Sequence, residues 1–135
     1  MKVEVGETIP CWTMERVAPE RMRTVAAILR DPNPVHWDTS ILAAQGLGER
    51  VINQGPLGLS YMLNMLMRWA GPTCIKRVRV RFPGPIFGED RVTAGGVVKA
   101  ITNVGDKTLA ECDIWLDRQD GSRALEGTAV VELPR

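Results

Sequence analysis

The sequence carries almost no net charge. It has 17 lysines and arginines against 16 aspartates and glutamates, which gives a formal net charge of +1 at pH 7. A protein that attracts nucleic acid or an anionic membrane through its whole electrostatic field needs a larger basic excess. We therefore expect no nucleic-acid partner and no membrane partner, and any basic binding site must be local.

Cysteine is scarce, and long apolar runs are missing. Cys11, Cys74 and Cys112 are odd in number, far apart and outside any CxxC or CxxH pattern, which argues against a zinc site or a redox pair. No stretch approaches the roughly 18 apolar residues of a membrane-spanning helix. Residues 1–12 contain charges and a proline where a signal peptide has its apolar segment. We expect a protein of a reducing compartment, the cytoplasm.

Repeats, low-complexity tracts and linker-like runs are also absent from the sequence. The 135 residues, 44% of them apolar, are enough for one domain with a substantial core and too few to suggest a second. We therefore expect a single domain over residues 1–135.

Three segments of the first half have the pattern of helices. Residues 19–29 (PERMRTVAAIL) begin with a proline at a favourable first position, and residues 38–48 (DTSILAAQGLG) form a short capped segment that ends in glycines. Residues 56–71 (PLGLSYMLNMLMRWAG) are the most apolar, with large side chains on nearly all sides of a helix. Such a helix has to be surrounded, and a domain of this size can surround one by wrapping a sheet around it.

The second half has the alternation of β-strands. In residues 75–82 (IKRVRVRF), Val78, Val80 and Phe82 fall on one face and three arginines fall on the other. Further strands are predicted at residues 90–102, 107–117 and 122–133.

Two features of these strands indicate how the sheet is arranged. The connections NVGD and RQDG are turn sequences, so the strands are sequential and antiparallel. Gly95 and Gly96 lie together inside one strand, where they indicate a bulge or bend. The pattern predicts an α+β fold of the hot-dog type, in which a curved antiparallel sheet wraps around one central apolar helix.

The only histidine of the sequence lies in its stiffest segment, DPNPVHWD, at residues 31–38. His36 follows Asp31 by five positions, and Pro32 and Pro34 stand between them. A histidine in an arbitrary protein is more often structural or merely exposed, and Asp31 would serve equally well as a helix-terminating residue. The aspartate and the Asn-Pro pair beside His36 favour a catalytic role instead.

The segment RDPNPVHWD resembles the hydratase motif of the MaoC-like, (R)-specific enoyl-CoA hydratase family, D-x-N-P-x-H, and Asp31, Asn33, Pro34 and His36 match it in register. Residues 49–60 (ERVINQGPLGLS) resemble the segment that follows in the family, which ends in H-G-M-L and, three residues later, a serine. The resemblance implies an enzyme, a hydro-lyase that reversibly adds water to a trans-2-enoyl-CoA to give an (R)-3-hydroxyacyl-CoA. It also implies an acyl-CoA substrate, a hot-dog dimer, and no metal or other cofactor.

The resemblance assigns Asp31 and His36 as the catalytic pair that binds the attacking water. Hydration of an enoyl thioester needs a base that takes a proton from water and an acid that protonates the α carbon. A carboxylate and an imidazole held on one water molecule supply both functions. The stiff turn keeps them in place, because a displacement of about 1 Å can cost roughly a hundredfold in rate. Asn33 is expected to brace the turn through side-chain hydrogen bonds to the backbone.

The second segment implies residues that support the reaction. Gly55 stands at the family's glycine position before the central helix, and its N–H is expected to bind the thioester carbonyl. Ser60 aligns with the family's serine and either supports the site or bonds back to a helix carbonyl. Gln54 replaces the family's histidine, so it can hydrogen-bond but cannot titrate, and Pro56 replaces a methionine and removes one backbone donor.

Four further residues are candidates for substrate binding. Arg77, Arg79 and Arg81 form either a solvated strand face or a clamp for the phosphates of coenzyme A, which arginine binds with bidentate geometry. Trp37 lies beside the motif and either lines the acyl pocket or anchors a core or an interface.

Residues 68–82 (RWAGPTCIKRVRVRF) resemble the WAGP region of the small single-hot-dog subunits of steroid-side-chain enoyl-CoA hydratases, which pair with a larger chain. This likeness implies a bulky acyl group and a heteromer with another hot-dog subunit, whereas the wider family implies a homodimer acting on simpler acyl-CoA thioesters. Two other functions stay open at this point. One is a non-catalytic subunit that binds an acyl thioester, which the changes at Gln54 and Pro56 permit; the other is a hot-dog acyl-CoA thioesterase.

Overall fold

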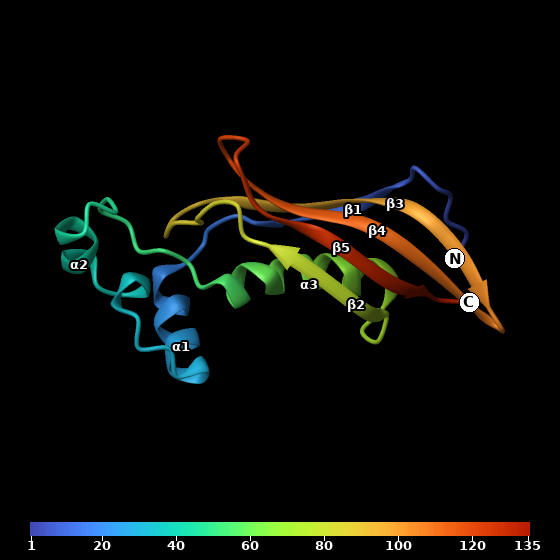
Figure 1. Cartoon of the computed structure of the whole chain (residues 1–135), viewed down its shortest axis with the longest axis horizontal. Helices are drawn as coiled ribbons and strands as arrows, with labels where there is room; N and C mark the ends of the chain where they lie inside the picture. The colour runs from blue at the N-terminus through green and yellow to red at the C-terminus, as the bar shows by residue number, and fades with distance from the viewer.

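The computed structural model describes residues 1–135 and contains one curved antiparallel sheet with a long helix along one face (Figure 1). The strands are β1 (Thr8–Met14), β2 (Ile75–Arg81), β3 (Val92–Val104), β4 (Lys107–Arg118) and β5 (Arg123–Leu133), in the order β1-β3-β4-β5-β2. The helices are α1 (Pro19–Leu29), α2 (Thr39–Ala44) and α3 (Gly55–Ala70), with a short 3-10 turn, η1, at Pro34–His36. The α+β hot-dog architecture predicted from the sequence is confirmed.

The helix α3 forms the core together with the inner face of the sheet. Its side chains Tyr61, Met62, Met65 and Leu66 are buried, and they belong to one cluster of 24 buried residues that includes members from every strand except β2. The strand β2 contributes Val78 and Val80, which are partly buried against this cluster. An apolar helix therefore packs against a sheet, as its sequence requires. No helix of the chain is both long enough and apolar enough to cross a membrane.

The helices α1 and α2 and the turn η1 lie together beyond one end of the sheet, next to the N-terminal end of α3, while both chain termini lie at the other end (Figure 1). Asp38 is the N-cap of α2, because its Oδ1 accepts a hydrogen bond from the Ser40 N–H at 3.0 Å. The helix ends at Ala44, before Gly46 and Gly48, which both have positive φ angles. This arrangement places η1, the turn that contains the histidine, close to the start of α3.

The first strand, β1, is absent from the sequence prediction. Its residues TIPCWTM contain Pro10, which cannot donate a hydrogen bond to a neighbouring strand. The structure places this strand at the edge of the sheet, paired only with β3, and its register shifts between Ile9 and Trp12, around the proline. An edge strand with an irregular register tolerates a proline, whereas a central strand would lose a ladder hydrogen bond.

The sequence predicts a bulge or bend at Gly95 and Gly96, and the ladder between β1 and β3 shifts at this point, since Ile9 pairs with Gly96 and Trp12 pairs with Ala94. Both glycines stay in regular register with β4, and the shift in the β3–β4 ladder lies between Val98 and Ala100. A Cβ atom on Gly95 would lie 2.6 Å from Nε1 of Trp115, and one on Gly96 would lie 2.9 Å from a backbone oxygen of β4. The two glycines therefore also allow close packing across the sheet.

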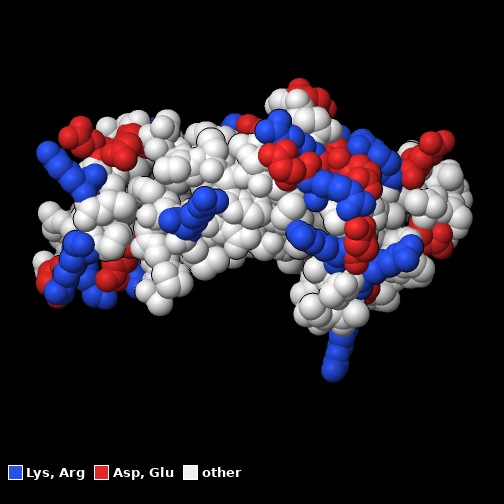
Figure 2. Space-filling model, turned by 180° about the vertical axis from the view of Figure 1, so that it is seen from behind, with Lys and Arg blue, Asp and Glu red and all other residues white.

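Charged side chains of both signs are interspersed on the surface. Figure 2 shows lysines and arginines mixed with aspartates and glutamates at both ends of the visible face, with a largely uncharged region between them. Many of these charges are paired, for example Arg16 with Glu20 and Glu89. This face therefore has no extended surface of one sign, in agreement with the low net charge.

Candidate active site

Asp31 and His36 face each other across the turn that follows α1. His36 is the last residue of η1, and its Nε2 lies 3.2 Å from Oδ2 of Asp31. The histidine side chain is 11% exposed and the aspartate side chain 31% exposed. The motif spacing thus does bring the two groups together, with the carboxylate on the side that solvent can reach.

Hydrogen bonds within the turn fix the carboxylate. Oδ1 of Asp31 accepts from the Asn33 N–H at 3.0 Å, which leaves Oδ2 directed at His36. The Asn33 side chain in turn accepts from the Val35 N–H at 3.3 Å and caps η1. Asn33 therefore makes the side-chain to backbone contact expected of a bracing residue.

Arg30 gives the chain its change of direction between α1 and Asp31. It has a left-handed backbone conformation with φ of 52°, and its N–H bonds to carbonyls of the last turn of α1. A residue with a Cβ atom rarely adopts this conformation, which glycine or asparagine usually fills at the end of a helix. The catalytic candidate Asp31 therefore follows a residue whose backbone is strained.

The second ring nitrogen of His36 is held by the backbone of Ile52. Nδ1 lies 2.6 Å from the Ile52 carbonyl oxygen, and because a carbonyl only accepts, Nδ1 carries a hydrogen. The Ile52 N–H donates to the Val35 carbonyl at 2.9 Å, so both backbone groups of Ile52 bond to the turn. Sequence reasoning missed Ile52, because a backbone contact leaves no signal in the identity of the side chain.

The start of α3 borders a hollow of about 180 Å³. Gly55 is the first residue of the helix, so its N–H has no partner within the helix. A Cβ atom at this position would lie 3.0 Å from the ring of Phe82, an exposed residue just beyond the end of β2. The hollow is lined by Asn53, Gln54, Gly55, Phe82, Gly84, Pro85, Ile86 and Leu125 and includes neither Asp31 nor His36.

Asn53 is a polar residue of this hollow that the sequence analysis missed. It is 7% exposed, and neither its amide nitrogen nor its amide oxygen has a hydrogen-bond partner. A buried polar group without a partner costs about 1–3 kcal/mol. The signal available in the sequence was a polar residue between Ile52 and the start of an apolar helix.

Gln54 and Ser60 both bond to nearby backbone. Nε2 of the buried Gln54 donates to the Met22 carbonyl at 2.7 Å, which ties α1 to the start of α3, and its Oε1 has no partner. Oγ of Ser60 donates to the Leu57 carbonyl at 2.5 Å, a local bond within α3. Contacts of these side chains with substrate stay predictions.

The arginines of β2 lie on the outer face of the sheet. Arg79 and Arg81 line an open hollow of about 560 Å³ together with Trp115 and Arg123, and Arg81 is paired with Glu126. A separate hollow of about 210 Å³ is lined in part by Arg77. The structure therefore does not gather the three arginines at the Asp31–His36 pair, and their role as a coenzyme A clamp stays a prediction.

Trp37 is 43% exposed and lines a hollow of about 250 Å³ beside α1. Charged residues of both signs share this hollow, among them Arg23, Arg50 and Glu49. Trp37 thus lies next to the motif but does not border the hollow at Gly55. Its contact with an acyl chain stays a prediction.

Comparisons with known proteins identify the family of the chain. The family model described as a MaoC like domain matches residues 3–113. The chain is 32% identical over 122 residues to the (R)-specific enoyl-CoA hydratase of Aeromonas caviae, a match that covers 89% of each chain. The residues that the family model matches include the Asp31–His36 turn and the whole of α3.

Two solved structures extend the similarity to nearly the full length. The (R)-hydratase from A. caviae involved in PHA biosynthesis has a TM-score of 0.86 at 31% identity, with 98% of each chain covered. A chain of the ChsH1–ChsH2 complex from Mycobacterium tuberculosis has a TM-score of 0.81 at 25% identity, with 99% of this chain and 100% of that chain covered. The family model, the sequence identity and the fold lead to one conclusion, that the chain belongs to the MaoC-like family.

Proposed function

We propose that the protein is a hydro-lyase that adds water reversibly to the double bond of a trans-2-enoyl-CoA and gives an (R)-3-hydroxyacyl-CoA. The observation that carries the proposal is the 3.2 Å contact between Oδ2 of Asp31 and Nε2 of His36 on the solvent side of a rigid turn. The activity named for the A. caviae relative, which is 32% identical, supports the same reaction class.

The geometry of the pair accommodates one water molecule. Two atoms 3.2 Å apart can both contact a water at hydrogen-bond distance, because the three then form a triangle with sides near 3 Å. Both ring nitrogens of His36 face oxygen acceptors, an arrangement that the doubly protonated ring satisfies. Asp31 is then the group that accepts a proton, and His36 is the group that donates one.

The reaction balances with these two groups alone. Asp31 takes a proton from water as the water oxygen bonds to the β carbon, and the electron pair of the double bond moves through the α carbon towards the thioester oxygen. The His36 Nε2–H then supplies the proton that bonds to the α carbon. A proton transfer from Oδ2 to Nε2 across their contact restores the starting state.

The thioester oxygen gains negative charge and needs donors. The free N–H of Gly55, at the N-terminus of the 16-residue helix α3, is one donor, and the unpartnered Asn53 amide beside it is a second. Residues 52–55 connect the carbonyl that holds His36 directly to this helix start. We assign the carbonyl of the substrate to the hollow at Gly55.

A non-catalytic role in a mixed assembly is the second candidate. The match to a chain of the ChsH1–ChsH2 complex covers that chain completely, and the name of that complex gives two components. In such an assembly this chain would bind acyl thioester together with a second hot-dog chain. Hydration of enoyl-CoA by the purified chain alone would show that the active form is homomeric, whereas no hydration would favour a heteromer.

The experiment that tests the proposal uses crotonyl-CoA and a bulky enoyl-CoA as substrates. Loss of the conjugated absorbance and release of free thiol are followed separately. Hydration predicts loss of absorbance without thiol and formation of the (R)-3-hydroxyacyl product. Thiol release would instead indicate a thioesterase, and no reaction from a folded dimer with either substrate would favour the non-catalytic subunit.

A further inference from the structure

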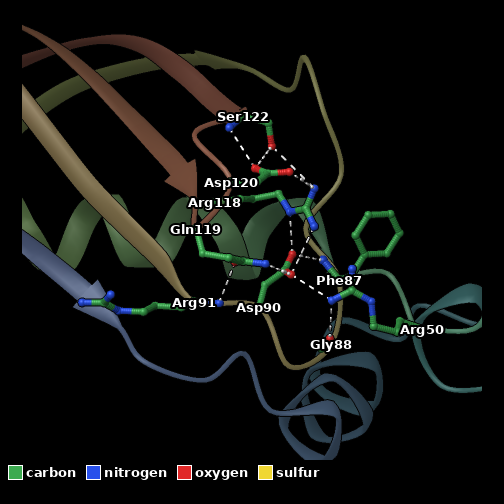
Figure 3. Close-up of polar contacts among 9 residues, drawn as sticks. All are labelled: Arg50, Phe87, Gly88, Asp90, Arg91, Arg118, Gln119, Asp120 and Ser122. Carbon is green, nitrogen blue, oxygen red and sulfur yellow. Dashed lines mark hydrogen bonds and ion pairs between the residues drawn. The ribbon is translucent and has the colours of Figure 1, made fainter.

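Asp90 is a fully buried carboxylate that has no part in the proposed reaction. Its side chain is 0% exposed and lies beside Arg118 and Gln119 at the end of β4, with four residues as hydrogen-bond donors (Figure 3). Its carboxylate accepts hydrogen bonds from Arg118 at 2.7 and 3.2 Å, from Gln119 at 2.8 Å, from Arg50 at 3.0 Å and from the Phe87 N–H at 2.8 Å. A buried charge is tolerated only when it is paired and fully hydrogen-bonded, as here.

This network holds the loop of residues 86–90 against the end of β4. The Phe87 N–H bonds directly to Asp90, and Arg50 also approaches the Gly88 carbonyl at 3.5 Å. Two guanidinium groups lie near the Phe87 ring, that of Arg50 at 4.9 Å and that of Arg118 at 5.0 Å from the ring centre. The loop is thus fixed by hydrogen bonds and by cation–π contacts to the same two arginines.

The loop in turn pairs with the segment before α3. The Gly88 N–H donates to the Val51 carbonyl at 2.8 Å, and the Asn53 N–H donates to the Ile86 carbonyl at 2.8 Å. These two bonds frame Ile52, which lies opposite Phe87 in an isolated β-bridge. The neighbours of Ile52 on both sides are therefore attached to the loop that Asp90 holds.

Ile52 itself bonds in the opposite direction, to the turn with the catalytic candidates. Its N–H donates to the Val35 carbonyl at 2.9 Å, and its carbonyl accepts from Nδ1 of His36 at 2.6 Å. A short extended segment whose alternate residues point to opposite sides thus links loop 86–90 to the histidine ring. A displacement of this segment moves the carbonyl that orients His36.

We propose that Asp90 is a positioning residue for His36, acting through loop 86–90 and the Ile52 carbonyl. The proposal rests on the proposed function, in which His36 is catalytic. An asparagine in place of Asp90 fits the space but leaves Arg50 without a counter-charge and Arg118 with Asp120 alone. It also supplies one acceptor oxygen instead of two. The loop then loses its fixed place, and the Nδ1 bond to Ile52 loosens.

Asp120 provides a matched control on the same arginine. It accepts from Arg118 at 3.3 Å and from Ser122 at 2.6 and 2.9 Å, and it makes no hydrogen bond with loop 86–90. Asp120→Asn therefore makes the same chemical change and disturbs the same guanidinium without touching the link to His36.

The test is ¹⁵N NMR of the histidine ring, which is unambiguous because the chain has one histidine. We expect the Nδ1–H of Asp90→Asn to exchange with water at least about tenfold faster than in the unaltered protein. The kcat for hydration should fall about tenfold with little change in KM, as for a misplaced catalytic group. Asp120→Asn should match the unaltered protein in both readouts.

A second variant keeps the test decisive if Asp90→Asn does not fold. Arg50 is 47% exposed and joins Asp90 to Gly88, so Arg50→Gln should fold. We expect it to show a smaller increase in Nδ1–H exchange and a smaller decrease in kcat than Asp90→Asn. A folded Asp90→Asn or Arg50→Gln protein with unaltered Nδ1–H exchange and unaltered kcat overturns the positioning role. The exchange of Nδ1–H is measured without substrate. If the unaltered protein did not hydrate enoyl-CoA, the proposed function would be refuted, and the exchange rates would still show whether Asp90 positions His36.

Discussion

Replacing Asp90 with asparagine should change how the stability of the protein depends on pH. Burial alone would raise the pKa of the Asp90 carboxyl, but hydrogen bonds from Arg118, Gln119 and the Phe87 N–H outweigh burial and lower the pKa from 3.8 to about 2. A carboxyl whose pKa is lower in the folded state stabilises the fold at any pH above its unfolded value. That stabilisation is lost as the pH falls through the folded value.

The size of this contribution follows from the two pKa values. A carboxyl that titrates at 3.8 when unfolded and at about 2 when folded contributes about 2 kcal/mol above pH 5. About 1 kcal/mol of this is lost by pH 3, and most of it by pH 2. Removing one partner of a buried pair costs about 3 kcal/mol at neutral pH, so Asp90→Asn should be destabilised by about that amount at pH 7.

The assay is urea unfolding of the unaltered and Asp90→Asn proteins at pH 7, 5 and 3, followed by the fluorescence of the 4 tryptophans. Other carboxyls with lowered pKa values, such as Glu132 beside Lys76, titrate in both proteins and cancel in the difference. The difference in unfolding free energy should shrink by about 1 kcal/mol between pH 7 and pH 3. A difference that stays constant over this range would refute the reasoning.

Three further substitutions test other contacts. Asn53→Ala should lower kcat about tenfold to a hundredfold by removing one donor to the thioester oxygen, measured with crotonyl-CoA, and an unaltered kcat would contradict the assignment. Arg30→Gly should raise the unfolding free energy by about 1 kcal/mol, because glycine adopts the left-handed conformation without strain; a lower melting temperature would contradict this. Gly95→Ala should cost about 1–3 kcal/mol in urea unfolding, because its Cβ would lie 2.6 Å from the Trp115 ring; unaltered stability would show that the ring moves freely.

Periodicity and capping residues were sufficient to predict most elements of the fold. The helix at Pro19–Leu29 has the bounds that its proline and apolar spacing indicate, and the strands β3, β4 and β5 follow from alternation and turn sequences. The edge strand β1 was missed, because Pro10 interrupts its pattern and an edge strand buries few side chains. The packing role of Gly95 was also missed, because its partner Trp115 lies on another strand.

The candidate site was predictable only where a side chain carries the chemistry in a short motif. The spacing of Asp31 and His36 predicted their contact, since a rigid turn joins them. The part played by Ile52 depends on a backbone carbonyl, and that of Asp90 depends on pairings between segments distant in the sequence. Such contacts arise from the tertiary fold and leave no local pattern.

The most direct test of the central claim is the kcat for crotonyl-CoA hydration by Asp31→Asn and His36→Ala, measured beside Asp38→Asn. Asp38 lies in the same motif segment but caps α2, so its substitution controls for disturbance of the turn. Loss of one half of an acid–base pair should lower kcat by about 10²–10⁴-fold in the first two variants and leave the third near the unaltered rate. Near-normal hydration by a folded Asp31→Asn or His36→Ala protein would contradict the account.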